Sequence, residues 1–156
     1  MIVKKKKIMA AGLVGMVLAA CLLVSVGYAE LETTTSSGQT VYVPIYSHVY
    51  AGDKETPFYL AATLSIRNTD PNHPITVVSV NYYDSDGRLL RSFLDKPSQL
   101  NALASRRFII KESDKAGGSG ANFIVGWEAE TYANIPIIES VMIGTKGQQG
   151  ISFLSR

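Results

Sequence analysis

The feature that most constrains the fold is an alternation of apolar side chains in Phe58–Asn68. In this stretch, FYLAATLSIRN, the apolar residues Leu60, Ala62, Leu64 and Ile66 occupy every second position. Because successive side chains of a β-strand point to opposite faces of a sheet, this period of two predicts a strand with one buried face. A second run, Ile75–Tyr83, is β-branched and aromatic and predicts another strand. The chain must therefore bury sheet faces.

Turn residues separate further segments of this kind. Asp84-Ser85-Asp86-Gly87 joins Ile75–Tyr83 to Arg88–Leu94 and predicts a hairpin. More strands are expected at Gln39–Tyr46, Ser105–Lys111, Ala121–Glu130, Ile137–Thr145 and Gly150–Leu154. About seven strands without a convincing amphipathic helix predict an all-β, antiparallel two-layer sandwich, immunoglobulin-like in topology. A small β-barrel is the alternative, because strand number alone does not separate the two folds.

Residues 1–29 have the pattern of a signal peptide or an N-terminal membrane anchor helix. Lys4–Lys7 precedes an uncharged apolar run, Ile8–Val26. Cleavage after Ala29, retention of residues 8–26 as a membrane anchor, and lipidation of Cys21 within the lipobox-like Leu18–Cys21 are all open. Each outcome places the rest of the chain outside the cytoplasm, in the periplasm or on the outer face of the cytoplasmic membrane. Residues 30–38 then form a polar linker, and residues 39–156 form the sandwich domain.

Charge and cysteine content exclude several classes of site. Lys4–Lys7 supplies four of the 15 Lys and Arg, so the other 11 face 13 Asp and Glu, and the exported part is slightly acidic. A nucleic-acid partner, which requires a clustered basic face, is not expected, and Arg106-Arg107 is interpreted as a solvated strand edge. Because Cys21 is the only cysteine, the exported part has no disulfide and no cysteine metal site.

The stretch Glu112–Trp127 contains the first candidate site. Gly117-Gly118-Ser119-Gly120 lacks the lysine and the following helix of a phosphate-binding loop. It also lacks the G-x-S-x-G pattern of a serine nucleophile. A tight connection that needs positive φ explains the glycines. The alternative is a recognition loop, in which backbone N–H groups with Asp114, Ser119 and Asn122 bind an anion or a partner's main chain.

The second candidate site is aromatic. Tyr46, His48 and Tyr50 share the parity of Tyr42, so a strand that extended this far would carry them on one face, as a polar-rimmed surface or as a site for a saccharide or peptide. His48 and His73 have no metal-ligand spacing. The Asp84–Gly87 segment lacks the remaining ligands of a calcium loop. No metal or cofactor is therefore expected.

Three blocks of sequence carry a family resemblance: VYVPIYSHVY (41–50), SIRNTDPNHPITVVSVNYYDSDGRLL (65–90) and ESDKAGGSGANFIVGW (112–127). With them the chain resembles the DUF3124 family of bacterial proteins over nearly all of residues 38–154. The resemblance implies a single domain of an uncharacterised, often exported family. It offers no activity, cofactor or catalytic residue to carry over.

These observations predict a non-catalytic binding or protein-interaction module of the cell envelope. Its partner is expected to be another envelope protein or a small ligand, with the membrane contacted through residues 8–26 or Cys21. One alternative is a structural accessory subunit whose edge strand, Gln39–Tyr46, pairs with a larger complex. The other is a small hydrolase that uses Ser119 or carboxylates such as Glu128 and Glu130.

Overall fold

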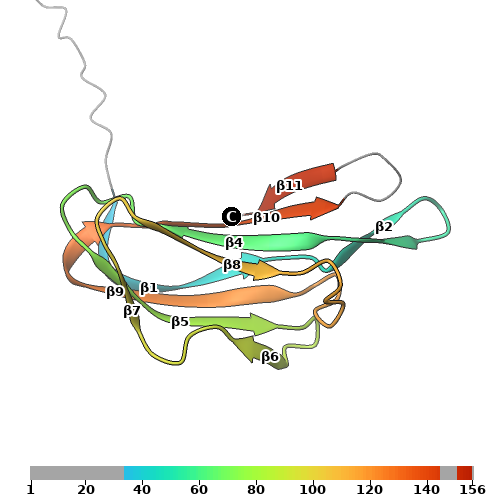
Figure 1. Cartoon of the computed structure of the whole chain (residues 1–156), viewed down its shortest axis with the longest axis horizontal. Helices are drawn as coiled ribbons and strands as arrows, with labels where there is room; N and C mark the ends of the chain where they lie inside the picture. The colour runs from blue at the N-terminus through green and yellow to red at the C-terminus, as the bar shows by residue number, and fades with distance from the viewer. Residues whose placement is uncertain (1–33, 145–150, 156) are drawn as a thin grey trace, which may run out of the picture. The chain divides into compact units, whose positions relative to one another are not determined.

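The computed structural model describes residues 34–144 and 151–155 (Figure 1). The predicted signal or anchor segment, Cys21 and the first residues of the predicted linker lie outside these ranges. Within them, no helix is long and apolar enough to cross a membrane. The described residues all belong to one compact unit, Thr33–Arg156.

The described part of the chain forms antiparallel strands in three sheets. The strands are β1 (Thr35–Pro44), β2 (His48–Ala51), β3 (Thr56–Tyr59), β4 (Ala61–Arg67), β5 (Ile75–Tyr83), β6 (Leu89–Ser92), β7 (Ser98–Leu100), β8 (Ser105–Ile110), β9 (Asn122–Asn134), β10 (Ile137–Gly144) and β11 (Ile151–Ser155). The first sheet has the order β1-β9-β5-β6, with β7 also paired to β5. The second sheet has the order β11-β10-β4-β8, and β2 and β3 form a separate hairpin.

The two larger sheets lie face to face with the core between them (Figure 1). The predicted apolar face of β4 supplies Leu64 and Ile66, and β9 supplies Val125 and Trp127; all four side chains are buried. Each sheet ends in two edge strands, so the predicted two-layer sandwich is confirmed and the barrel alternative is not observed. Pro44, which cannot donate to a ladder, lies on the edge strand β1 as expected.

The inner pairings follow the immunoglobulin arrangement, and the outer pairings do not. In immunoglobulin domains strand B pairs with E, and strand C pairs with F. Counted in chain order, β4 pairs with β8 in one sheet and β5 pairs with β9 in the other, as that arrangement requires. The first and last strands have exchanged sheets, because β1 pairs with β9 and β10 pairs with β4.

Two predicted boundaries differ from the structure. The segment predicted as one strand at Phe58–Asn68 is divided into β3 and β4, because the Leu60 N–H leaves the ladder and donates to the Ser47 carbonyl at 2.9 Å. The first strand begins at Thr35 rather than Gln39, so part of the predicted linker pairs with the end of β9. Polar residues are tolerated there because Thr35 and Ser37 face solvent.

The predicted hairpin between β5 and β6 is confirmed. Asp84 Oδ1 accepts the N–H groups of Asp86 and Arg88 at 2.9 and 2.8 Å. Gly87 has a φ of 79°, in the left-handed region that favours glycine. The local Asp-Gly signal therefore identified the turn, while the register of the hairpin shifts between Tyr82 and Tyr83.

A buried polar cluster ties together several connections of the sandwich. The Asn68 side-chain amide donates to the carbonyls of His73, Leu100 and Asn101 at 2.8, 3.3 and 3.1 Å. Its Oδ1 accepts the N–H of Asp70 at 3.0 Å. One short side chain thus holds the β4–β5 connection against the β7–β8 connection.

Asp70 extends this cluster through its carboxylate. Backbone N–H groups of Asn134, Asn72 and His73 donate to it at 2.9, 2.8 and 2.8 Å. These hydrogen bonds, led by the one from Asn134, lower the pKa of Asp70 from 3.8 to about 2. The carboxylate therefore has a structural role, and the described residues bring no group of three or more His, Cys, Asp and Glu together that could hold a metal ion.

Candidate functional site

The glycine-rich loop between β8 and β9 is held through its carbonyl groups. The Gly117 carbonyl accepts the Ser85 N–H and the Ser85 hydroxyl, both at 3.0 Å. The Gly118 carbonyl accepts the Ser47 N–H at 2.9 Å, and the Gly120 N–H donates to Ser85 Oγ at 2.9 Å. The loop therefore connects the end of the β5 strand to the segment that follows β1.

Two glycines of this loop are required by local geometry. Gly118 has a φ of 81°, which L side chains rarely adopt. At Gly117, a Cβ atom would overlap the Tyr82 hydroxyl and lie 2.8 Å from Ser47 Oγ. Burial raises the pKa of Tyr82, whose hydroxyl lies 3.4 Å from Ser47 Oγ. The tight-connection interpretation therefore explains Gly117 and Gly118.

The aromatic residues predicted to share one face are divided between two places. Strand β1 ends at Pro44 and the β2–β3 hairpin begins at His48, so the parity of Tyr46 does not carry over to His48 and Tyr50. Tyr46 packs edge-on against Phe153, with ring centroids 5.8 Å apart. His48 Nε2 lies 3.2 Å from the Tyr50 hydroxyl. The His48 ring also packs against the Tyr59 ring, with ring centroids 6.0 Å apart. The single aromatic face is therefore not formed.

The glycine loop and the β2–β3 hairpin nevertheless meet. The Lys115 ammonium lies 4.1 Å from the centroid of the Tyr59 ring, a cation–π contact between the loop and the hairpin. Through Tyr59, this contact links His48 to the loop that carries the other predicted residues. We call this region the loop end of the sandwich, defined by residues 46–50, 59 and 114–122.

Solvent reaches only some of the predicted residues at the loop end. Gly117 and Asn122 are buried, and Asn122 lies in the ladder opposite Pro44 and Tyr83. Ser119 is partly exposed and Gly120 is exposed. Asp114 Oδ2 accepts a hydrogen bond from Arg91 at 3.2 Å. The predicted site is thus largely a structural junction, with Asp114, Ser119 and Gly120 at its surface.

A second region, along β8, was not predicted as a site. Strand β8 ends the second sheet and β6 ends the first, so the two edges flank an open side of the sandwich. Phe93 and Phe108 close the core there, with ring centroids 5.5 Å apart. The Arg91 guanidinium lies over Phe93 at 5.2 Å, and that of Arg106 lies over Phe108 at 5.8 Å. Arginine side chains therefore cover both rings.

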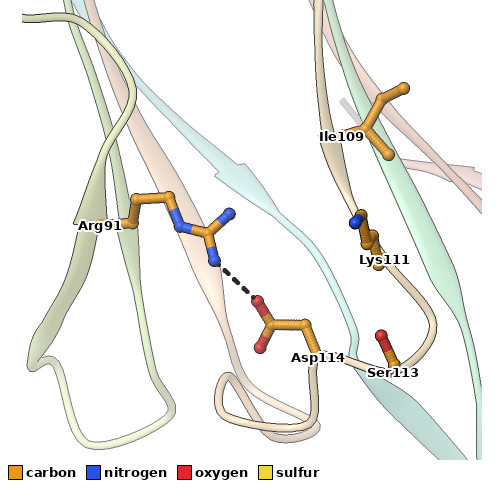
Figure 2. A pocket seen from close by; sticks show the side chains of 5 residues that line it. All are labelled: Arg91, Ile109, Lys111, Ser113 and Asp114. Atoms are coloured by element: carbon orange, nitrogen blue, oxygen red, sulfur yellow. Dashed lines mark hydrogen bonds and ion pairs between the residues drawn. The ribbon is translucent and has the colours of Figure 1, made fainter.

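Three pockets surround β8. The first, of about 290 Å³, lies between β6 and β8 and includes Arg91, Lys111 and Asp114 (Figure 2). The second, of about 430 Å³, lies on the outer face of the second sheet and is lined by residues of β4 and β8 with Val141. The third, of about 280 Å³, lies beside the β6–β7 connection. We call β8 with these three pockets the β8 side.

The β8 side is basic although residues 30–156 as a whole are slightly acidic. Six basic and two acidic side chains line its pockets: Arg67, Arg91, Lys96, Arg106, Arg107 and Lys111, with Asp95 and Asp114. Arg67 also pairs with the buried Glu139 at 3.5 Å. The remaining cations outnumber the carboxylates, which makes the surface attractive to a negatively charged group.

The whole sandwich, from the middle of β1 to the end of the chain, matches one family model. That model is described as a protein of unknown function (DUF3124), and it matches residues 38–156. The chain belongs to the DUF3124 family. No curated protein and no solved structure matches it.

In this DUF3124 domain, the sequence signal for the β8 side is the segment Arg106-Arg107-Phe108-Ile109. The strand and its exposed edge were predicted from it, and both are observed. The proximity of this segment to Arg91 and Arg67 was not predicted, because the three come together only through strands that lie far apart in the sequence. Ile109, which is 51% exposed, has Arg107 and Lys111 two positions away on either side.

Proposed function

We propose that this DUF3124 protein is a non-catalytic module of the cell envelope that binds another envelope protein through its β8 side. The observation that carries the proposal is the edge strand β8 with a pocket on each of its flanks. An interface requires accessible apolar surface together with polar groups at its rim. Ile109, which is 51% exposed, supplies the first, and Arg107 and Lys111 supply the second.

One pair of the carboxylates, Glu128 and Asp114, lacks the spacing that glycoside hydrolysis requires. Glu128 lies six residues beyond Asn122 along β9, which corresponds to roughly 20 Å at the rise of an extended strand. Asp114 lies in the loop before Asn122, and its partner Arg91 is opposite Tyr82, near that same end of β9. A glycosidase pair is separated by about 10 Å or less. These two carboxylates are therefore too far apart to share a substrate.

The β8 edge is better suited to a partner than the β1 edge considered from the sequence. Pro44 has no N–H to donate, and its carbonyl already accepts the Ser140 hydroxyl at 2.6 Å. Among the described residues, β8 pairs with β4 only, and its other edge makes no backbone ladder. The β1 edge is therefore interrupted at Pro44, whereas β8 contains no proline.

Site-specific photo-crosslinking in the native cell tests the proposal on the full chain. A photoreactive amino acid replaces Ile109, with Tyr132 (72% exposed, on β9) as the matched exposed control and Ser119 as a probe of the loop end. We expect a discrete crosslinked protein from position 109 and none from position 132. Crosslinking from position 119 alone would place the interface at the loop end, and no crosslink from position 109 would contradict the proposal.

A further inference from the structure

The backbone of β8 has one free edge that is long enough to accept another strand. It runs from Ser105 to Ile110 and forms ladder hydrogen bonds with β4 on one side only. In an edge strand, every second residue directs its N–H and C=O groups away from the sheet, where they need water or another strand as partner. These groups make up the first half of a binding site for an extended segment.

The flanks of β8 supply the second half of that site. Side chains of an added strand would alternate between the two faces of the second sheet. Those on the outer face would lie next to Arg107 and Ile109, beside the pocket that contains Thr63 and Ser65. Those on the inner face would enter the pockets between β8 and the other sheet, next to Arg91 or Arg106. Each face therefore has a place for every second side chain.

The charges on both faces select the chemistry of the segment. Arg107 lies opposite Ser65 in the ladder, and Arg67 lies opposite Ser105, so the two guanidinium groups are diagonal neighbours on the outer face. Glu139, opposite Ser65 on its other side, pairs with Arg67. The direct ladder partner of Arg107 is the uncharged Ser65, and the acidic residue of the same row, Glu139, lies one strand further away. Opposite charges directly across a strand pair stabilise it, and like charges destabilise it.

We propose that β8 captures an extended acidic segment of a partner protein by strand addition, with glutamate or aspartate side chains placed beside Arg107 and Arg106. This inference rests on the proposed function and specifies its mode and partner chemistry. Main-chain hydrogen bonds to β8 supply affinity, and the pockets supply the preference for acidic side chains. The Arg106 guanidinium donates to Ser98 Oγ across the open side, and this contact exchanges for one with the incoming carboxylate.

Binding of a designed peptide to the full chain in detergent tests whether the segment binds by strand addition. The probe is a capped, fluorescently labelled ten-residue peptide in which pairs of glutamates alternate with pairs of valines, so that each face of the added strand carries carboxylates. Its controls are the lysine–valine counterpart and a version methylated on alternate backbone nitrogens. The methylated peptide keeps every charge but cannot form the ladder. We expect binding by the glutamate peptide alone, measured by fluorescence anisotropy, and slower hydrogen exchange at alternate amides of residues 105–110.

Charge-reversal variants test whether the β8 arginines select an acidic segment. Arg107→Glu is expected to weaken binding by about tenfold, because it removes one attraction and introduces one repulsion of exposed charges. Arg88→Glu, a matched change at an exposed turn residue that lines none of the three β8 pockets, is expected to change affinity by less than about twofold. Equal losses in the two variants would overturn the role of Arg107.

Three other outcomes overturn the proposal. They are absence of binding by the glutamate peptide, equal binding by the methylated peptide, and displacement of the peptide by inorganic phosphate at equal concentration, which would reveal a simple anion site. These failures are distinguishable from failure of the proposed function. If position 109 crosslinks to a partner in the cell while the peptide does not bind, the interface stands and strand addition is wrong.

Discussion

At Gly117 the chain has no room for a side chain. A Cβ atom at this position would lie too close to three neighbours: the Tyr82 hydroxyl, Ser47 Oγ and the Ala121 methyl group. The residue is buried, so the neighbours cannot move into solvent to make space. Gly117 therefore belongs to the folded architecture of the loop end, whatever the exposed residues Ser119 and Gly120 contact.

We expect Gly117→Ala to lower the free energy of unfolding by about 1–3 kcal/mol, the usual cost of overpacking. Urea unfolding followed by circular dichroism measures it. The cost should be smaller in a Tyr82→Phe background, because removal of the hydroxyl relieves the closest overlap. An equal cost in both backgrounds would show that Tyr82 does not limit the space. Gly120→Ala serves as the control, since its nearest contact, Ser85 Oγ, is at 3.3 Å.

Asp70 gives the fold a dependence on acid pH. Its pKa in the folded state, about 2, lies below its ordinary value of 3.8, so the ionised carboxylate stabilises the folded state above about pH 4. This contribution is lost as the pH falls towards 2. In Asp70→Asn the same pH range should produce a smaller fall in the free energy of unfolding. Urea titrations at pH 7, 4 and 2.5 measure how the free energy of unfolding depends on pH in each protein. The same dependence in both would contradict the stabilising role of the ionised Asp70 carboxylate.

At the scale of elements, the Asn68 side chain joins the β4–β5 and β7–β8 connections alongside two backbone hydrogen bonds, from Asn68 N–H to the Ala104 carbonyl and from Leu103 N–H to the Asp70 carbonyl. Asn68, only 3% exposed, bonds three carbonyls of two connections and one N–H. The three carbonyls lose this partner together if the side chain is removed. Buried carbonyls without partners are costly, so this position contributes more to stability than its size implies.

Asn68→Ala is therefore expected to lower the free energy of unfolding by about 2–4 kcal/mol, from the loss of several buried hydrogen bonds. Asn101→Ala is the matched control, because Asn101 is exposed and contributes only its backbone carbonyl to the cluster. Its effect should stay within about 0.5 kcal/mol. Chemical denaturation of both variants measures the difference, and similar values for the two would contradict the role of Asn68.

Individual elements could be predicted where the signal is local. The alternation Leu60–Ile66 identified the buried face of β4, and Asp84–Gly87 identified the hairpin, because each pattern lies within one element or one turn. The pairing of β10 with β4 could not be predicted, because every strand offers the same ladder groups. For the same reason the meeting of Lys115 with Tyr59, and of Arg106 with Ser98, appears only in the folded chain.

The candidate site, too, could be predicted where its signal is local and not where it depends on long-range contacts. Composition identified the glycine loop but not its neighbours, so its glycines were interpreted before the positions of Tyr82 and Ser85 were known. The single face expected for Tyr46, His48 and Tyr50 is not formed, because the alternation of side chains holds only within a continuous strand and β1 ends at Pro44. The role of Asp70 could not be predicted, because its partners include Asn134, which lies at the far end of β9.

At the scale of the whole molecule, β9 is an inner strand of the first sheet that carries the tryptophan into the core between the two sheets. It pairs with β1 on one side and β5 on the other, and it carries Trp127, the only tryptophan, at 2% exposure. We expect the Trp127 fluorescence and the far-ultraviolet circular dichroism to change in a single, coincident urea transition. Two separated midpoints would show that the sheets unfold independently.

The two arginines of β8 have a further consequence for a protein held at high local concentration. A free edge strand is a template on which copies of the same chain can polymerise. Pairing of two β8 strands would bring the Arg106-Arg107 segments of both copies together in one small area, where their charges repel. The residues that attract an acidic strand thus also oppose the edge-to-edge pairing of two copies of the sandwich through β8.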